Sequence, residues 1–315
     1  MDSLSDIYTI GLFDDKYRAF LETVVQLRPR LHRYCSRMTG SVMDGEDVVQ
    51  EALFEAYRKL DQYDNSRALT PWLFGIVHNR CIDLLRRREV REAAEASAAV
   101  SELFCPVPAP VLGVGRAVER LVVHLPPKER ACVLLKDVLD YTLLEIAELV
   151  GSTEGGVKAA LNRGRTKLAA LPDSKETERV VDPELSHLLH LYVERFNRRD
   201  WNGLRELISA DAQLLFPDGY GGQLVNSPYF SRYESSPIFV WQMAVGSVDG
   251  ELVVLCMRQD VEGWKLNSPI RLKWANGRIV RIADYHFCPW VLPAAGFVSV
   301  GGTEYRDVSP APWGP

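Results

Sequence analysis

One predicted helix carries polar and basic side chains at helical spacing. This stripe consists of Glu154, Lys158, Asn162 and Arg165, which lie at successive turns beside an apolar face. Side chains of these types exchange hydrogen bonds with base edges, and the basic ones also neutralise phosphates. The stripe therefore predicts a surface that reads duplex DNA.

The residues before the stripe have the pattern of a helix-turn-helix. Thr142 is followed three residues later by Glu145, a capping-box arrangement that begins a short helix. Gly151 is expected to end that helix and Ser152 to begin the next. The apolar face of the second helix comprises Val157, Ala160, Leu161, Gly164 and Leu168. Such a motif places its second helix in the major groove.

Two glycines stand in the first turn of this second helix. Gly155 and Gly156 each cost about 1 kcal/mol relative to alanine in a helix. They either let the backbone approach a phosphate or mark loose recognition of DNA, and the sequence leaves both readings open.

Another predicted helix ends in a run of arginines. Thr70 and Pro71 have the N-cap and first-turn proline pattern of a helix start. The basic end of this helix contains Arg80, Arg86, Arg87, Arg88 and Arg91. This is more charge than the helix dipole requires, which favours contact with phosphates.

A further predicted helix, following Asp44, has an acidic face that also carries a large aromatic residue. Its apolar face comprises Val49, Leu53, Ala56, Tyr57 and Leu60, and the opposite face comprises Asp47, Glu51, Phe54 and Arg58. Phe54 on a charged face indicates a partner surface, although an isolated exposed phenylalanine or packing within the domain explains it equally well.

Catalytic and metal chemistry have weaker support. The six cysteines form no CxxC pair and stand near no histidine cluster, so reduced core thiols are expected, with no metal and no cofactor. Asp218, Asp284 and His286 are candidates for acid–base catalysis. One histidine and two carboxylates without known geometry fit pocket-lining or core roles better.

Composition sets the class of protein. A chain of 315 residues with 47% hydrophobic and 25% charged residues predicts two or three folded domains. No apolar run reaches the roughly 18–20 residues of a membrane span, and the acidic first twenty residues lack a basic leader, so a cytoplasmic protein is expected. The net charge of −5 is unusual for an independent DNA binder and indicates dependence on a partner.

The chain divides into blocks of different character. All-α blocks are predicted at residues 10–91 and 116–171, separated by a linker at 92–115 and followed by a second polar linker at 172–182. Residues 183–300 predict an α+β domain, with helices at 185–196 and 201–208 and then antiparallel strands at 213–216, 238–245, 252–259, 270–274 and 279–287. Asn276 and Gly277 predict a hairpin turn, and a disordered tail is expected at 301–315.

These motifs together resemble the sigma-70 family of bacterial transcription initiation factors, in its small extracytoplasmic-function (ECF) form. Residues 46–51 resemble the part of region 2 that binds core RNA polymerase, and residues 72–74 with Asn79, Asp83 and the arginines resemble its promoter-melting helix. Residues 125–130, 145–147 and 157–158 resemble region 4. The order, the spacing and the proline-rich linker match over residues 10–170.

The resemblance implies a factor that binds core polymerase and promoter DNA. Core polymerase would contact Glu46, Asp47, Gln50, Glu51 and Phe54. The residues implied in minus-ten contact are Asn65, Ser66, Arg67, Trp72, Asn79, Arg80, Arg86 and Arg87. Those implied at the minus-thirty-five element are Thr153, Glu154, Lys158, Asn162, Arg163 and Arg165, with Arg163 and Lys167 on phosphates. For Trp72, a place in the core is favoured over stacking on melted DNA.

Residues 192–197 with Asp200 and Trp201 resemble a SnoaL-like domain, a curved sheet with helices around a cone-shaped pocket. Asp218, Gly219, Gly221 and Gly222 resemble a short glycine-rich regulatory motif of such extensions. We expect this domain to regulate the factor in cis, either by binding a small molecule or through contacts alone, and an anti-sigma partner is a further expectation. The alternatives are a ligand-binding or enzymatic SnoaL-like domain fused to a DNA-binding module, and a stand-alone helix-turn-helix regulator.

Overall fold

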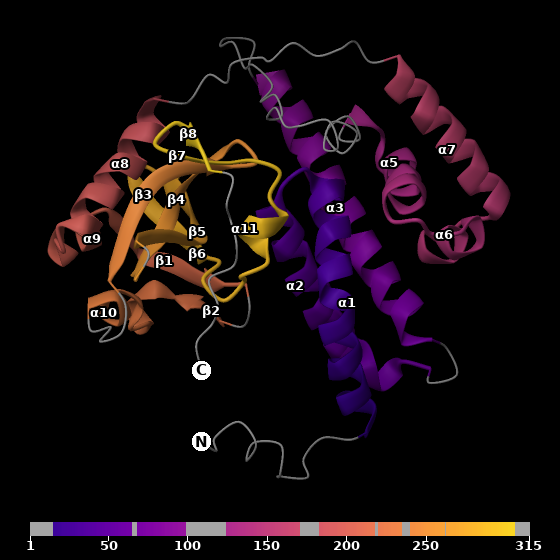
Figure 1. Cartoon of the computed structure of the whole chain (residues 1–315), viewed down its shortest axis with the longest axis horizontal. Coiled ribbons are helices and arrows are strands. Elements are labelled where there is room, and N and C mark those ends of the chain that lie inside the picture. Colours follow the sequence, from indigo (N-terminus) through magenta and orange to yellow (C-terminus); the bar gives the residue numbers. More distant parts are fainter. Residues whose placement is uncertain are drawn as a thin grey trace.

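The computed structural model describes residues 15–64, 68–98, 124–170, 183–217, 220–234, 240–261 and 263–305. Two helical blocks lie next to each other, and a sheet-containing domain lies on the other side of the first block (Figure 1). The predictions for Asn65, Ser66, Arg67, Asp218 and Gly219, and for most of the first linker and all of the second, fall outside the described residues.

The first block consists of helices α1 (Asp15–Thr39), α2 (Val42–Lys59) and α3 (Leu69–Ala98), with a short 3-10 turn η1 (Leu60–Gln62) after α2. Helix α2 begins before Asp44, because the Ser41 hydroxyl accepts a hydrogen bond from the Asp44 backbone N–H and caps the helix. Its predicted apolar face is buried except for Tyr57, which is 49% exposed. Helix α3 begins one residue before Thr70 and continues seven residues beyond Arg91.

The second block contains α5 (Pro127–Val133), a π-helical turn η3 (Leu134–Val138), α6 (Leu143–Leu149) and α7 (Glu154–Ala169). The capping box predicted at Thr142 and Glu145 is confirmed, and Gly151 has the positive φ of 61° that a helix end of this kind requires. Thr153 rather than Ser152 caps α7, since its hydroxyl accepts from the Gly156 backbone N–H. Helices α6 and α7 form the expected helix-turn-helix.

The two helical blocks share one hydrophobic core. Arg130 of α5 is buried and donates from Nη1 to the carbonyl of Met38 at the end of α1. Arg30 of α1 donates to the Tyr141 hydroxyl at 2.6 Å, and its guanidinium lies 5.1 Å from that ring. These contacts hold the helix-turn-helix against the first block.

The third block begins with α8 (Pro183–Asn197) and α9 (Trp201–Glu206). Both predicted helices are present, but α9 ends two residues before its predicted end, because Ile208 begins the first strand. Its eight strands are β1 (Ile208–Phe216), β2 (Tyr220–Gln223), β3 (Trp241–Val248), β4 (Glu251–Asp260), β5 (Gly263–Ala275), β6 (Arg278–Asp284), β7 (Val298–Val300) and β8 (Thr303–Glu304). They form one sheet in the order β2-β1-β6-β5-β4-β3-β7-β8. The predicted α+β class is confirmed.

Two expectations about this sheet are wrong in part. Strand β1 runs parallel to β6, whereas the sequence predicted only antiparallel strands. The segment 301–305 is not a disordered tail, because β8 pairs with β7 at the edge of the sheet. The predicted hairpin at Asn276 and Gly277 is confirmed, since both residues have the positive φ of a type I′ turn.

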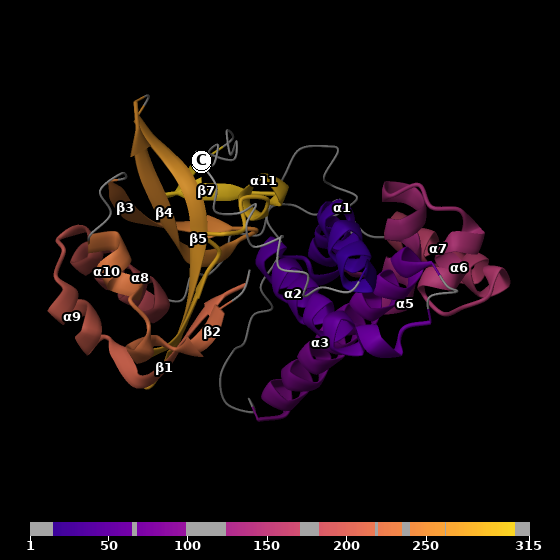
Figure 2. The ribbon, with the colours of Figure 1, turned by 90° about the horizontal axis from the view of Figure 1, so that it is seen from below.

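The two faces of the sheet are covered differently. Helices α8, α9 and α10 (Tyr229–Glu234) lie on one face, whereas α11 (Val291–Ala294) lies on the other, next to α2 (Figure 2). Each face of the sheet has its own hydrophobic core, and alternate residues of β4 face the two cores. Val254 and Cys256 lie in the first core, beneath α8, α9 and α10, and Val253 and Leu255 lie in the second, next to α11. The second core is completed by Val42 and Met43 of α2, so it belongs to both domains.

The five cysteines within the described part of the chain are buried free thiols, as expected. No helix there combines the length and apolar character needed to cross a bilayer.

Candidate functional site

The predicted DNA-reading stripe lies on the outer surface of α7. Glu154, Lys158, Asn162 and Arg165 are exposed, and the apolar face behind them is buried apart from Leu168, which is partly exposed. Arg165 donates from Nε to Asp137 at 3.0 Å, so this side chain is held by the turn before the helix-turn-helix.

Two basic residues of α7 are anchored to the fold. Arg163 and Lys167 donate to opposite oxygens of Glu129 at 2.9 and 2.8 Å. Glu129 is only 6% exposed, and these two cations lower its pKa against the opposing effect of burial. Arg163 and Lys167 therefore orient α7 on α5 through Glu129.

The glycine pair of α7 has two different explanations. A Cβ atom at Gly156 would lie 2.7 Å from the Ser152 hydroxyl and 3.3 Å from the Thr153 hydroxyl that caps the helix. A Cβ atom at Gly155 would meet only that Thr153 hydroxyl, at 4.0 Å. Gly156 leaves room for the cap, whereas Gly155 has no comparable packing reason.

The arginine run of α3 separates into bound and exposed members. Arg80 donates to Glu55 at 2.6 Å, and Arg88 contacts Asp44 and the Thr39 carbonyl. The side chains of Asn79, Arg86 and Arg87 are exposed. Trp72 is partly buried against the core, with its ring 4.7 Å from that of Tyr63.

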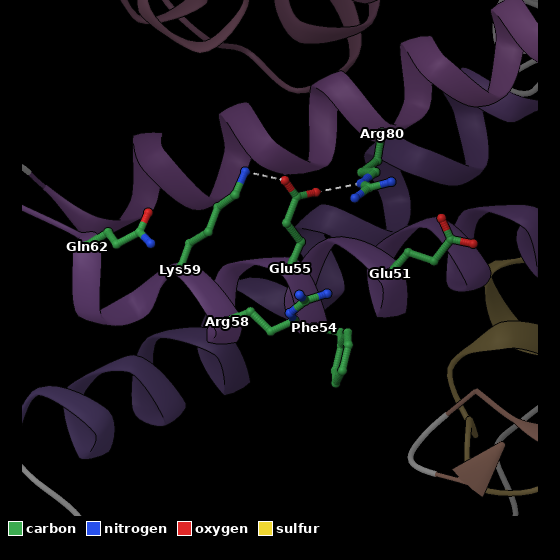
Figure 3. A pocket seen from close by; sticks show the side chains of 7 residues that line it. All are labelled: Glu51, Phe54, Glu55, Arg58, Lys59, Gln62 and Arg80. Carbon is green, nitrogen blue, oxygen red and sulfur yellow. Dashed lines mark hydrogen bonds and ion pairs between the residues drawn. The ribbon is translucent and has the colours of Figure 1, made fainter.

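The acidic face of α2 forms a continuous stripe, which we call the α2 stripe: Asp44, Asp47, Glu51, Phe54 and Arg58. Its C-terminal half borders an open groove of about 500 Å³ (Figure 3). The groove is lined by Glu51, Phe54, Glu55, Arg58, Lys59, Gln62 and Arg80. Phe54 is 64% exposed, as its position on the charged, solvent-facing side of the predicted helix indicates.

The N-terminal half of the α2 stripe is covered by the third block. Arg271 of β5 donates from Nη1 to Asp44 at 3.0 Å and to Asp47 at 3.3 Å, while its Nη2 donates to Glu251 at 2.6 Å. The Tyr285 hydroxyl donates to Asp47 at 3.0 Å. One cation thus bridges two carboxylates of α2 and one of the third block.

Glu46 is fully buried behind this contact. The Trp290 indole N–H donates to its Oε2 at 2.7 Å, Arg28 pairs with its Oε1, and Gln50 donates to Oε1 at 3.1 Å. The Arg28 guanidinium lies 4.6 Å from the Trp290 ring. Glu46, predicted to contact core polymerase, is therefore inaccessible to a partner in this arrangement.

Apolar and capping contacts complete the interface. Val42 and Met43 are 2% and 0% exposed within the core shared with the third block. Asp249, in the turn between β3 and β4, accepts from the Val42 backbone N–H at 3.1 Å. A residue of the third block therefore satisfies one of the free N–H groups at the start of α2.

The two stripe carboxyls in this interface have opposite pKa shifts. Burial raises the pKa of Asp47 to about 6, with the neighbouring Asp44 adding to the effect and Arg271 opposing it. Burial also disfavours ionisation of Asp44, but attraction to Arg271 and Arg88 outweighs it and lowers the pKa of that carboxyl. Arg271 thus secures the charge of Asp44 more fully than that of Asp47.

Asp284 and His286, the acid–base candidates within the described residues, lie on the other face of the third block. Asp284 is fully buried and accepts from Tyr229 and Tyr233 at 2.9 and 2.8 Å and from the His286 backbone N–H at 2.9 Å. Burial raises the pKa of Asp284 and lowers that of His286. Of the predicted glycine-rich motif, Gly221 and Gly222 lie in β2, paired with Leu215 and Leu214 of β1.

The sequence patterns do not identify four residues that form this interface: Arg271, Tyr285, Trp290 and Asp249. For Arg271 the sequence does contain one signal. It is a charged residue between Ile270 and Leu272 in a predicted strand, so its side chain lies on the opposite side of the sheet from those two apolar side chains.

Comparisons with known proteins agree with this architecture. The family model described as Sigma-70 region 2 matches residues 23–91, and the one described as Sigma-70, region 4 matches residues 115–168. The ECF RNA polymerase sigma factor SigW of Bacillus subtilis is 30% identical over 162 residues, which cover 48% of this chain and 87% of SigW. Two helical blocks of this kind define a sigma-70-type factor.

The chain belongs to the ECF sigma factors of this family. It is also similar to the ECF RNA polymerase sigma factor SigG of Mycobacterium tuberculosis, with 30% identity over 255 residues. That match covers 72% of this chain and 66% of SigG, so the chain spans about two thirds of that relative.

Two solved structures have a more distant likeness. The sigma factor RpoE in complex with the anti-sigma factor NepR from Bartonella quintana is 22% identical, with a TM-score of 0.39, covering 48% of this chain and 94% of that one. Mycobacterium tuberculosis SigJ is 16% identical, with a TM-score of 0.33, covering 84% of this chain and 95% of SigJ.

Proposed function

We propose that this chain is a transcription initiation factor that its own third domain holds in a closed, inactive state. In the open state the α2 stripe docks on core RNA polymerase, α7 reads the minus-thirty-five element, and α3 with residues 65–67 engages the minus-ten element. Membership of the ECF sigma factors supports the polymerase and promoter partners.

The contact of Arg271 with Asp44 and Asp47 carries the proposal for the closed state. Two stripe carboxylates and the adjacent Glu46 are bound to the third block through Arg271, Tyr285 and Trp290. A polymerase surface cannot use these groups until the third domain has moved. The linker makes this competition intramolecular, so even a modest interface suppresses docking effectively.

We propose a structural rather than a catalytic role for Asp284 and His286. Both Asp284 oxygens already accept hydrogen bonds, and the neighbouring Tyr285 points to the opposite face, where it contacts Asp47. The hydrogen bonds to Asp284 hold the end of β6 in place, and with it the neighbouring Tyr285 in the surface that covers α2. A small-molecule ligand for the third domain and an anti-sigma partner remain predictions.

Substitution of Arg271 tests the closed state. Arg271→Met keeps the apolar stem but removes every ion pair to Asp44, Asp47 and Glu251. We expect the variant to bind core polymerase about tenfold more tightly than the wild-type chain and to give more promoter-specific transcript in vitro, because paired charges at the centre of an interface dominate its stability. The matched control is Arg205→Met, in α9 on the other face of the sheet. If Arg271→Met and the control both behave like the wild type, the third domain does not restrain docking.

A further inference from the structure

The third domain covers only half of the α2 stripe. Asp44 and Asp47 are held by Arg271 and Tyr285, whereas Glu51 and Phe54 lie one and two turns further along the same face. Phe54 is 64% exposed, and Glu51 is exposed with no hydrogen bond or ion pair to any residue that the structure describes. In the closed state, the N-terminal half of the α2 stripe is therefore covered, and its C-terminal half is open to solvent.

The open half has the features of a docking surface. The exposed Phe54 ring stands beside a groove of about 500 Å³, with the Arg58 guanidinium 6.0 Å from its centroid (Figure 3). On the far side of the groove, Glu55 is neutralised by Lys59 and Arg80. Glu51 is thus the acidic group of this groove that is available to a partner's cation.

The covered half indicates what chemistry the stripe accepts. There, a guanidinium binds Asp44 and Asp47, and the Tyr285 hydroxyl donates to Asp47, while the Trp290 indole N–H donates to the adjacent buried Glu46. The open half continues the same stripe with a carboxylate and an apolar ring. A surface that carries basic and apolar side chains complements both halves.

We propose that core RNA polymerase first binds the open half, at Glu51 and Phe54, while the third domain is still closed, and then displaces that domain from Asp44 and Asp47. This inference rests on the proposed function. Spontaneous opening would break the Arg271 ion pairs and expose Val42 and Met43 together, before any compensating contact formed. When polymerase binds the open half, it forms favourable contacts first. It then replaces the third domain on the covered half.

A chain locked in the closed state tests this order of events. The Asp249 carboxylate accepts from the Val42 backbone N–H at 3.1 Å, so Val42→Cys and Asp249→Cys place two thiols across the interface. The full-length double variant is oxidised, and its equilibrium binding to core polymerase is measured before and after reduction. Recovery on reduction of at least the wild-type affinity shows that the variant is folded.

Three results of the locking experiment are informative. We expect the locked chain to bind at least about tenfold more weakly than the reduced chain, and the added Phe54→Ala to remove most of the remaining binding. No binding by the locked chain would overturn the two-step docking while leaving the closed, inactive state intact. Equal binding by the locked and reduced chains would overturn the closed, inactive state itself, and the two-step docking with it.

Association kinetics give a second test that needs no lock. When docking begins at the open half, the observed association rate is proportional to the stability of that first complex, so Phe54→Ala should lower the association rate constant of the full chain about tenfold. The control is Val261→Ala, a fully exposed apolar residue in the turn between β4 and β5. If Phe54→Ala associates as fast as the control, initial docking does not use the open half.

Discussion

At the scale of single residues, the interface depends on a few side chains that each serve several partners. Arg271 pairs with Asp44, Asp47 and Glu251, and Glu46 binds both Arg28 of its own block and Trp290 of the third. A buried carboxylate of this kind is stable only while its partners stay in place. Substitutions that remove one partner should therefore have larger effects than their size suggests.

Trp290→Phe tests the buried bond to Glu46. The ring is largely kept, but the indole N–H that donates to Glu46 at 2.7 Å is lost. We expect the variant to lose about 1–3 kcal/mol of stability, because the carboxylate retains its desolvation cost. The free energy of unfolding is measured with urea.

Trp274→Phe is the matched control, since the Trp274 indole nitrogen is buried without a hydrogen-bond partner among the described residues. It should cost less than Trp290→Phe. If the two variants lose equal stability, the bond to Glu46 contributes nothing beyond ring packing.

Asp47→Asn tests the pH dependence of the closed state. Burial raises the pKa of Asp47 from 3.8 to about 6, so its contribution to stability is full at low pH and is lost as the pH rises through about 6. Asparagine stays neutral at every pH and still accepts from Tyr285, while Arg271 keeps its ion pairs with Asp44 and Glu251. We expect the variant to melt about 2–4 °C above the wild type at pH 7.5, and the two curves to converge near pH 4.

Melting temperatures of both chains between pH 4 and pH 8 check this expectation, with the exposed Asp83→Asn on α3 as the control. A difference between Asp47→Asn and the wild type that has the same size at every pH would contradict it.

At the scale of elements, the sequence predicts what is periodic and local. The helix-turn-helix, the wet face of α2 with its exposed Phe54 and the turn at Asn276 all follow from spacings of a few residues, and all were predicted. The parallel pairing of β1 with β6 and the contact between Asp47 and Arg271, 224 residues apart, leave no such pattern. Burial of Glu46 was likewise unpredictable, because it depends on a domain that follows more than 130 residues later.

The start of α7 allows an element-scale prediction. Gly155→Ala removes the helix cost of glycine without a steric conflict, so we expect stability to rise by about 0.5–1 kcal/mol. Gly156→Ala gains the same propensity but crowds Ser152 at 2.7 Å, and it should be neutral or destabilising. Urea unfolding of both variants measures the difference.

If Gly155→Ala is stabilising but lowers binding to promoter DNA, the glycine serves close approach of the backbone to a phosphate. A destabilising Gly155→Ala would show that the space around this position is occupied.

At the scale of the whole molecule, the first block is contacted on both sides. The third domain covers α2, and the second block packs on α1 through α5 and η3 and on α3 through α6, with α7 on the outside (Figures 1 and 2). A net charge of −5 and a short basic stripe make strong independent DNA binding unexpected. Under the proposed function, polymerase sets the separation at which the two helical blocks read a promoter.

Arg130 is the main polar link between the helical blocks. It is 8% exposed and donates to the Leu125 carbonyl of its own block and to Met38 at the end of α1. Arg130→Met leaves both carbonyls buried without this donor. We expect a loss of about 1–3 kcal/mol in stability and a larger separation between the blocks, because charged hydrogen bonds to buried carbonyls are costly to remove.

The separation is measured by energy transfer between dyes attached at the exposed positions Asp61 and Thr166. Lys128→Met is the matched control, since it removes an exposed cation two residues away on the same helix. The control should keep the wild-type distance and stability, because Lys128 lies outside the contact with α1. An Arg130→Met chain that keeps both values as well would show that apolar packing alone joins the blocks, and polymerase would then have to separate them against that packing.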